Sequence, residues 1–556
     1  MAESLVIMVV ALLSIAATTV IGPKVGLAAP LLLVAIGVGA SFVPALRDVE
    51  IDPEWILEGL LPPLLYSSAV SMPAMNFRRE FRAISGLSVV LVVASALLLG
   101  VFFMLVIPDL GFAWGVALGA IISPTDAVAT SIVKQTSVSK RVVAILDGES
   151  LLNDASALVV LRTAIVATAA SFSFWGALGT FAWSVLVAAV VGALVGVGNL
   201  WVRKFIAAAP VNTVVSFTVP FIAAVPAELA GGSGLVAAVV AGLVTGVGAP
   251  RVLSPRNRLS DTQNWHTMEL VLEGVVFLTM GLQIKHIVES VERDHAGVGT
   301  ALVIAVAALA LTLVIRAAYF APALGVIARR ARRYARAQPR FESLQEKLST
   351  PEGRARTAEK FEATRGRSLS EKRLDKFATR VTRGLADIDY FLREPLGWRE
   401  GTTVVWAGMR GAVTVAAAQT LPADTPQRSM LILVAYAVAV ASLTVQGGTI
   451  GPLLAMIAPK DDGSRAAQDA AERERLLQLI RDAAEAVPEP EPPAGDDRQA
   501  EFELALRHRI AVLDAQRVAL LDARDDGTFD ADILEEALMN VDASQIAIEL
   551  RGRHVE

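Results

Sequence analysis

The chain has 556 residues, no cysteine and a formal net charge of −5, and 54% of its residues are hydrophobic against 19% charged. Without cysteine it can form no disulfide framework, thiolate nucleophile or cysteine-based metal site. The charges are unevenly spread, and long apolar runs occupy most of the first 330 residues. Composition therefore predicts an all-α polytopic membrane protein.

The apolar runs predict about 13 transmembrane helices in chain order. They are expected near residues 4 to 21, 25 to 45, 55 to 70, 83 to 107, 111 to 134, 141 to 170, 176 to 200, 211 to 229, 234 to 250, 266 to 288, 300 to 328, 402 to 420 and 429 to 457. Basic residues such as Lys24, Arg203 and Arg256 fall in every second loop. By the positive-inside rule, the N-terminus lies outside and the C-terminus inside. The first apolar run has no basic leader and is expected to be a membrane helix, not a removed signal.

Two segments lie outside the predicted spans. The expected parts are transmembrane segments at 1–328 and 401–459, a basic cytoplasmic loop at 329–400 and an acidic helical tail at 460–556. The loop has about 19 Lys and Arg against about 11 Asp and Glu, which favours contact with anionic lipid headgroups, although a solvated linker would have the same composition. The tail has about 12 basic and about 24 acidic residues, and helices are expected at 499 to 524 and 530 to 550. Its charge predicts docking on the loop; a solvated or dimerising appendage is the alternative.

Two predicted spans contain residues that disfavour a continuous helix. The fifth contains Pro124, which removes a backbone donor, followed closely by Asp126. The twelfth has Gly408 and Gly411 on either side of Arg410. These spans are seven apart and therefore antiparallel, and interrupted helices at matching places of inverted halves indicate a transporter's ion site. Alternatively, the two glycines serve only close helix packing.

The sixth span places Glu149 and Asp154 in an apolar stretch, where a carboxylate costs roughly 2.5 to 3.5 kcal/mol. With 3.6 residues per turn, Ser150 lies above Asp154 on one face, while Glu149 lies near Asn153 on another. A hydroxyl and a carboxylate on one face suit a hard cation such as Na⁺ or Li⁺, and Glu149 needs a fixed partner. A purely structural role is disfavoured, because apolar residues could replace such groups with little loss of stability.

These motifs resemble the monovalent cation:proton antiporter-1 family, the Na⁺/H⁺ exchangers of NhaP type. The resemblance rests on Thr125-Asp126, on Gly148-Glu-Ser-Leu-Leu-Asn-Asp154, on an arginine in the eleventh span and on Gly408-Met-Arg-Gly411, and it covers residues 1 to about 460. It implies an inverted-repeat fold with interrupted spans five and twelve, and a homodimer in the inner cell membrane that serves pH homeostasis.

The resemblance also implies roles for the residues of the ion site. Asp154 is expected to be the carboxylate that binds the ion and the proton, with Asn153 as its companion. Ser150 and Thr125 would be further Na⁺ ligands, Thr125 through its backbone carbonyl.

Other expected roles are structural. Asp126 would compensate the half-helix ends, and Glu149 would pair with Arg316 of the eleventh span. The chain departs from the family pattern at Ser67, where many relatives carry an acid, so one possible ligand is lost.

The predicted function is exchange of Na⁺ or Li⁺ for H⁺. Asp154 can hold either a proton or a cation, so both loaded forms have the same charge, and Asn153 offers no second carboxylate beside it. K⁺/H⁺ exchange by the same fold is the main alternative, and an uncoupled channel would need no titratable acid. A hydrolase is disfavoured because Ser150 has no histidine in its own span or in the interrupted spans to activate it. We therefore expect no enzyme activity, no catalytic residue, no cofactor beyond the transported ions and no nucleic-acid partner.

Overall fold

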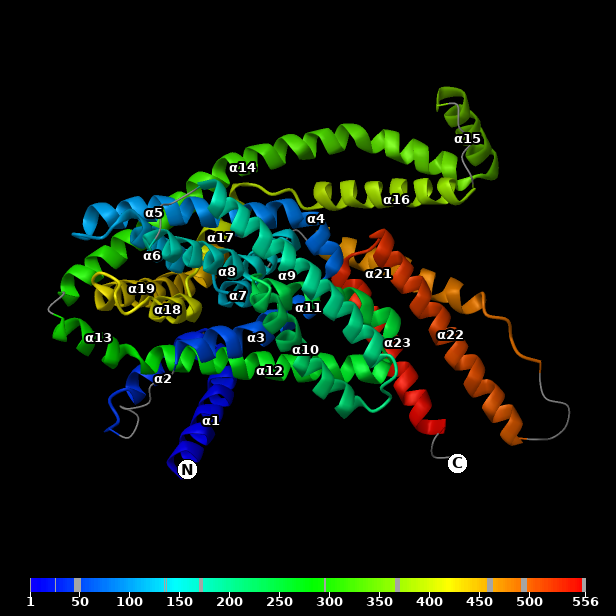
Figure 1. Cartoon of the computed structure of the whole chain (residues 1–556). Coiled ribbons are helices and arrows are strands. Elements are labelled where there is room, and N and C mark those ends of the chain that lie inside the picture. The colour runs from blue at the N-terminus through cyan, green and yellow to red at the C-terminus, as the bar shows by residue number, and fades with distance from the viewer. Residues whose placement is uncertain are drawn as a thin grey trace. The chain divides into compact units, whose positions relative to one another are not determined.

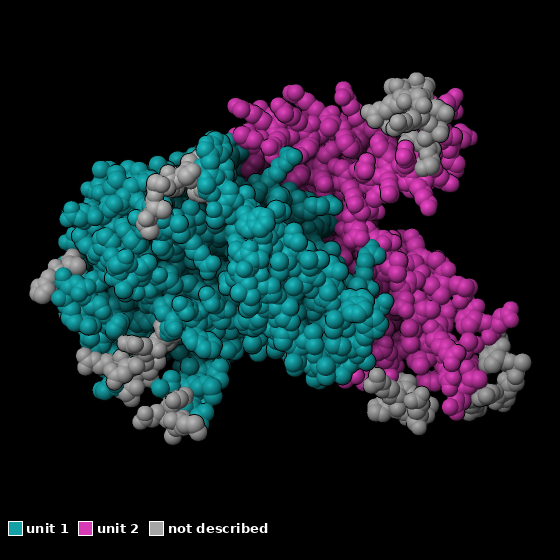
Figure 2. All heavy atoms as spheres, viewed as in Figure 1, with its two compact units in different colours: residues 1–252, 260–324, 398–458 teal, residues 253–259, 325–397, 459–556 magenta. Residues whose placement is uncertain are grey.

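The structure is a computed structural model, and it describes residues 2–25, 27–44, 52–134, 136, 138–169, 174–294, 297–365, 371–457, 464–491 and 498–552. Every regular element in these ranges is a helix (Figure 1), which confirms the predicted all-α class. The chain divides into two compact units (Figure 2). Unit 1 comprises residues 1–252, 260–324 and 398–458, and unit 2 comprises residues 253–259, 325–397 and 459–556. The expected boundary at 459/460 lies outside the described residues.

The helices of unit 1 follow the predicted apolar runs. In chain order they are α1 (Ala2–Val25), α2 (Ala29–Ala40), the π-helical η2 (Trp55–Leu60), α3 (Leu61–Ser71), α4 (Ala74–Ser85), η3 (Gly86–Leu91), α5 (Val92–Val106), α6 (Phe112–Ile122), α7 (Val128–Lys134), α8 (Lys140–Ala169), α9 (Phe174–Arg203), α10 (Ala209–Leu229), α11 (Gly234–Val252), most of α12 (Pro255–Leu282), α13 (Ile284–Arg293), the first half of α14 (Val298–Ser349), α17 (Trp398–Trp406), α18 (Ala412–Gln419), α19 (Arg428–Ser442), η4 (Leu443–Gly447) and α20 (Gly448–Ile457).

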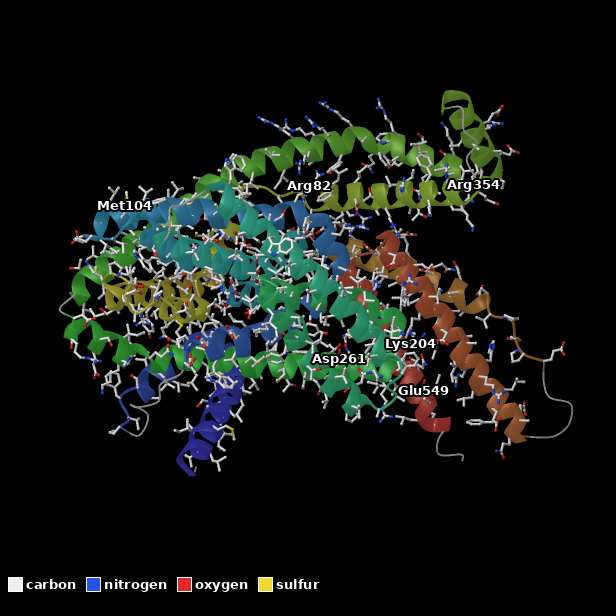
Figure 3. All side chains as sticks on the ribbon, in the orientation of Figure 1. Arg82, Met104, Lys204, Asp261, Arg354 and Glu549 are labelled. Carbon is white, nitrogen blue, oxygen red and sulfur yellow. The ribbon has the colours of Figure 1, made fainter. Side chains whose placement is uncertain are left out.

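Nine helical stretches within the described residues are long and apolar enough to cross a membrane, and α2 and α6 are shorter apolar helices. Apolar side chains such as Met104 project outward from these helices (Figure 3), as expected of surface that faces lipid. The predicted interruptions are present, since α6 ends before α7 begins and α17 ends before α18 begins. The number of spans and their orientation stay predictions.

The core of unit 1 holds α8 in place. Leu61 and Leu65 of α3, Ile84 of α4 and Val239 of α11 pack in one buried cluster with Leu151 of α8. Leu151 lies between Glu149 and Asp154 in the sequence. Packing of close-fitting apolar side chains therefore fixes the rotation of α8 about its axis, and with it the direction of each acid.

Unit 2 contains the predicted loop and tail. Its helices are the second half of α14, α15 (Pro351–Arg365), α16 (Glu371–Arg393), α21 (Ser464–Glu485), α22 (Arg498–Asp526) and α23 (Ala531–Gly552). Leu476, Leu520 and Leu534 form a buried core between the three tail helices. The expected contact of the acidic tail with the basic loop is present, because Arg383 of α16 pairs with Asp526 of α22 at 3.3 Å.

Candidate ion-binding site

The two interrupted helices meet inside unit 1. The backbone N–H of Asp126, in the break between α6 and α7, donates to the carbonyl of Met409, in the break between α17 and α18, at 2.7 Å. Four helix ends therefore lie close to this contact, and each has backbone groups with no partner in its own helix. Two charged side chains supply hydrogen-bond partners for these backbone groups: one serves the amino-terminal ends and the other serves the carboxyl-terminal ends.

Asp126 serves the amino-terminal ends. Its Oδ1 accepts the N–H of Val128, at the start of α7, at 3.0 Å, and it also accepts the N–H of Ala412, at the start of α18. A Cβ at Gly411 would lie only 1.4 Å from Oδ2 of Asp126, so only glycine lets the carboxylate approach. A negative charge at two helix amino termini is favourable, in line with the expected compensating role of Asp126.

Arg410 serves the carboxyl-terminal ends. Its Nε donates to the carbonyl of Ile122, the last residue of α6, at 2.9 Å, and its Nη1 donates to the carbonyl of Gly408, just beyond α17. Arg410 is 3% exposed. A positive charge is favourable where helices end, so the twelfth span carries the counterpart of Asp126.

Glu149 and Arg316 form a buried, two-point contact. Nη2 of Arg316 donates to Oε2 of Glu149 at 2.7 Å, and Nη1 donates to Oε1. The side chain of Arg316 is 1% exposed and that of Glu149 is 2% exposed. Nε of Arg316 also donates to the carbonyl of Val404 in α17 at 2.9 Å. A Cβ at Gly408 would lie 2.5 Å from this Nε. Gly408, like Gly411, therefore makes room for a charged side chain, whereas the alternative for these glycines was helix packing alone.

Asn153 holds the first break from behind. Its Nδ2 donates to Oγ1 of Thr125 at 2.5 Å, and this hydroxyl donates to Oε1 of Glu149 at 3.3 Å. Nδ2 also lies 3.5 Å from the carbonyl of Thr125. Asn153 is not among the residues that line the pocket described next. The structure thus places it as a support of Thr125.

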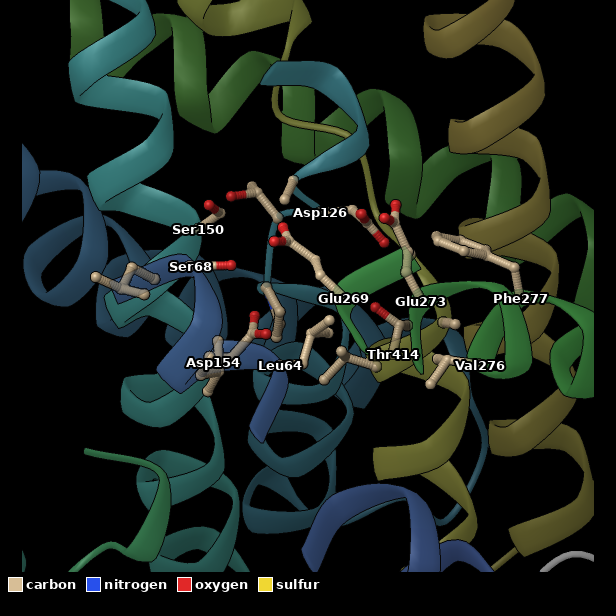
Figure 4. A pocket seen from close by; sticks show the side chains of 18 residues that line it. Leu64, Ser68, Asp126, Ser150, Asp154, Glu269, Glu273, Val276, Phe277 and Thr414 are labelled. Carbon is tan, nitrogen blue, oxygen red and sulfur yellow. The ribbon is translucent and has the colours of Figure 1, made fainter. Parts of the chain in front are cut away.

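A pocket with a volume of about 70 Å³ lies beside the breaks (Figure 4). That volume has room for a few water molecules. Its polar lining comes from Ser68 of α3, Thr125 and Asp126 of the first break, Ser150 and Asp154 of α8, Glu269 and Glu273 of α12, and Thr414 of α18. Four of the predicted site residues, Thr125, Asp126, Ser150 and Asp154, therefore share one cavity.

Asp154 has no fixed counter-charge. Asp154 is 7% exposed. No described side chain forms an ion pair or a hydrogen bond with it, whereas Glu149 and Asp126 both have such partners. No Lys, Arg or His is among the residues that line the pocket. A buried carboxylate without such a partner is stable only when a proton or a cation accompanies it. The arrangement can therefore bind either one.

Sequence reasoning missed Glu269 and Glu273. Both fall within the expected span at 266 to 288, and an acid inside an apolar span was the signal that identified Glu149 and Asp154. Both acids lie where α12 changes from a polar first half to an apolar second half, so this signal is weaker in the sequence. Within the described residues, no three His, Asp or Glu side chains converge closely enough to ligate one metal ion together. The four acids are therefore spread around the cavity.

Comparison with known proteins identifies the family of the chain. The family model for the transmembrane part of sodium/hydrogen exchangers matches residues 8–344 and 377–456. An uncharacterized Na⁺/H⁺ exchanger of Escherichia coli is 35% identical over 270 residues, which is 47% of this chain and 49% of that protein. An uncharacterized Na⁺/H⁺ exchanger of Mycobacterium tuberculosis is 25% identical over 580 residues, covering 98% of this chain and 96% of that protein.

A solved structure has the same fold. The sodium proton antiporter MjNhaP1 of Methanocaldococcus jannaschii superposes with a TM-score of 0.55 at 15% identity, over 82% of this chain and 100% of that one. The family match spans most of unit 1, including both breaks and α8. The chain therefore belongs to the sodium/hydrogen exchanger family of multi-pass membrane proteins.

Proposed function

We propose that the protein exchanges Na⁺ or Li⁺ for H⁺ across the inner cell membrane by alternating access, with Asp154 holding the cation and the proton in turn. One observation carries this proposal: Asp154 is buried in a pocket beside two crossing interrupted helices, and no described residue neutralises its charge. The charged groups of the two interrupted helices and of the Glu149 pair have partners: Glu149 has Arg316, Asp126 has two helix amino termini, and Arg410 has two helix carbonyls.

The proposed cation ligands are Asp154, the hydroxyl of Ser150 and the backbone carbonyl of Thr125. The Ser150 hydroxyl donates its proton to the carbonyl of Asp147 at 3.0 Å, which leaves its oxygen lone pairs available to a cation. The Thr125 carbonyl accepts only a long contact of 3.5 Å from Asn153. A set of oxygen ligands with one carboxylate suits hard monovalent cations.

Competition for Asp154 would couple the two fluxes. Each loaded form carries one positive charge at the same carboxylate, so we propose electroneutral exchange, one cation for one proton. The apparent affinity for the cation should then weaken as the pH falls, because protons occupy the same group. A pH-independent affinity would contradict competition at one site.

We also infer that the protein acts as a homodimer and that the basic helices of unit 2 contact anionic lipids. Arg329, Arg330, Arg332 and Arg333 lie together at the point where α14 leaves unit 1. A cluster of this kind beside a membrane helix is attracted to anionic headgroups. The mass of the protein in nanodiscs, and its retention by vesicles with and without anionic lipid, would test the two inferences.

The decisive experiment measures proton flux in vesicles that contain the purified protein. Outward Na⁺, Li⁺ and K⁺ gradients are imposed in turn, with the membrane potential clamped at zero or set to an inside-negative value. We expect Na⁺ and Li⁺ to drive proton movement, K⁺ to fail, and the potential to have no effect. Equal driving by K⁺ would favour the K⁺/H⁺ alternative, and cation flux without proton movement would indicate a channel.

A further inference from the structure

Two carboxylates of α12 face the proposed ion site from the other side of the cavity. Glu269 and Glu273 are four residues apart, so they lie on one face of the helix. Both line the pocket together with Asp126 and Asp154 (Figure 4). α12 thus supplies half of the acidic side chains around the cavity.

Glu269 is held by a hydroxyl of the neighbouring helix. Ser67 of α3 donates its hydroxyl proton to Oε2 of Glu269 at 3.1 Å. The basic side chains of His266 and Lys134 are close enough to attract the carboxylate of Glu269. The carboxylate of Asp147, which pairs with Lys134 at 3.0 Å, repels it. Glu269 therefore has both a hydrogen-bond donor and positive groups near its carboxylate.

Glu273 is in a different position, because its charged neighbours are all acids. Asp126 and Glu269 are within electrostatic reach of it, and no described residue forms an ion pair or a hydrogen bond with it. The charge of Asp126 is already balanced by two helix amino termini. A carboxylate surrounded by like charges favours a cation beside it, or a proton on a neighbouring acid, either of which reduces the repulsion. A structural glutamate would be expected to have a fixed partner, as Glu149 does.

We propose that Glu273 is a second cation-binding carboxylate of the transport pocket, on the wall that faces Asp154. This inference rests on the proposed function and deepens it. Since the pocket has room for a few water molecules, Glu273 binds the cation directly or through water. It holds the same number of protons in both loaded forms, so the exchange remains one for one.

The test compares Glu273→Gln, Glu273→Asp and Glu269→Gln with the unchanged full chain in vesicles. Proton flux is measured against Na⁺ concentration at several pH values. Glu273→Gln should raise the Na⁺ concentration for half-maximal exchange by about tenfold and leave the maximal rate within about threefold, because a nearby negative charge is lost. Glu273→Asp, which keeps the charge, should restore most of the affinity. Glu269→Gln should have a smaller effect on affinity.

Glu228→Gln is the matched control. Glu228 is an acid at the end of α10 that lies outside the pocket, 3.8 Å from Arg162, so its replacement should leave Na⁺ affinity unchanged. Protection by Na⁺ against thermal unfolding gives a second measurement that needs no transport, and it should require higher Na⁺ for Glu273→Gln.

The outcomes separate this inference from the proposed function. If the unchanged protein shows no cation-driven proton flux, the proposed function itself is wrong. If the unchanged protein exchanges but Glu273→Gln keeps the same Na⁺ affinity in flux and in thermal protection, Glu273 is no cation ligand. Exchange by Glu273→Gln that becomes sensitive to membrane potential would contradict the constant protonation of Glu273.

Discussion

The charged residues of the two units follow different rules, beginning with unit 1. There, Glu80 and Arg141 pair at 2.6 Å with both side chains 3% exposed, and Arg203 and Asp261 pair at 3.0 Å with exposures of 0% and 8%. Each is a charge removed from solvent together with its partner. Removal of one partner from such a pair leaves the other charged and dry.

Several pairs of unit 2 lie largely in solvent, whereas the contacts of Asp542 with Arg258 and Arg517 are mostly buried. Arg354 and Asp375 are 3.3 Å apart with exposures of 46% and 58%, and Arg383 and Asp526 are also 3.3 Å apart with exposures of 40% and 36%. Pairs of this kind contribute about 0 to 1 kcal/mol, because water and salt screen them. The N–O distances of these ion pairs are therefore similar in the two units, but their contributions to the free energy of unfolding differ because their burial differs.

This difference shows how to recognise function in unit 1. Where burial makes every unpaired charge unfavourable, an acid without a partner is conspicuous, and Asp154 and Glu273 are such acids. In unit 2 an unpaired acid is ordinary and indicates nothing. The following predictions test that contrast, from the largest expected effect to the smallest.

The strongest test is Asp154→Asn. Cation-driven proton flux should fall to the level of vesicles without protein, since an amide can neither release a proton nor balance a cation. Stability should be retained or increased, because an unpartnered buried charge is removed. Flux in vesicles and thermal unfolding in detergent measure both effects. Substantial exchange by a folded Asp154→Asn protein would disprove the site.

The next effect concerns the pair of Glu149 and Arg316. Either Glu149→Ala or Arg316→Ala should lower the free energy of unfolding by about 3 to 5 kcal/mol, because each leaves its partner buried and charged. The double replacement should lower it by less than the sum of the two losses. Thermal and denaturant unfolding of all four proteins measure the coupling, and additive losses would mean that the contact contributes nothing.

A moderate effect is expected from the tail. Asp542 of α23 pairs with Arg258, in the first turn of α12, and with Arg517 at 3.0 Å, and α12 continues to Glu269 and Glu273. Truncation after Ile457 should leave exchange intact but change its dependence on pH and salt by about two- to fivefold, the size of one partly buried pair. Asp542→Asn should reproduce part of this change.

The control for the tail experiment is Asp469→Asn, the same substitution at a carboxylate of α21, since the described ion pair of the tail with α12 is made by Asp542. A truncated protein with the same pH and salt profile as the full chain would show that the tail is a structural accessory.

The smallest effect is expected for Arg354→Ala. Its pair with Asp375 is about half exposed, so the free energy of unfolding should change by less than about 0.5 kcal/mol and exchange should be unaltered. Unfolding and flux measurements on this variant set the baseline for charge removal in unit 2. A loss comparable to that of Arg316→Ala would abolish the contrast between the units.

Much of this protein could be predicted from local sequence. Apolar runs must cross a membrane as helices, because backbone groups in lipid need partners within the helix. Pro124 and the pair of Gly408 and Gly411 disfavour helix where they stand, and both breaks appear at those places. The spacing of Ser150 and Asp154 followed from helix geometry, and both line the cavity.

The rest depended on which distant segments meet. Arg410 lies 288 residues from Ile122, whose carbonyl it binds, and no local pattern specifies such a pairing. Asn153 is expected to be the companion of Asp154, and only the fold shows that its amide binds the hydroxyl of Thr125, 28 residues away. Glu273 is an ordinary acid in its own stretch of sequence. Only the tertiary structure surrounds it with Asp126 and Glu269 and leaves it without a counter-charge, because burial and proximity belong to the fold and not to the residue.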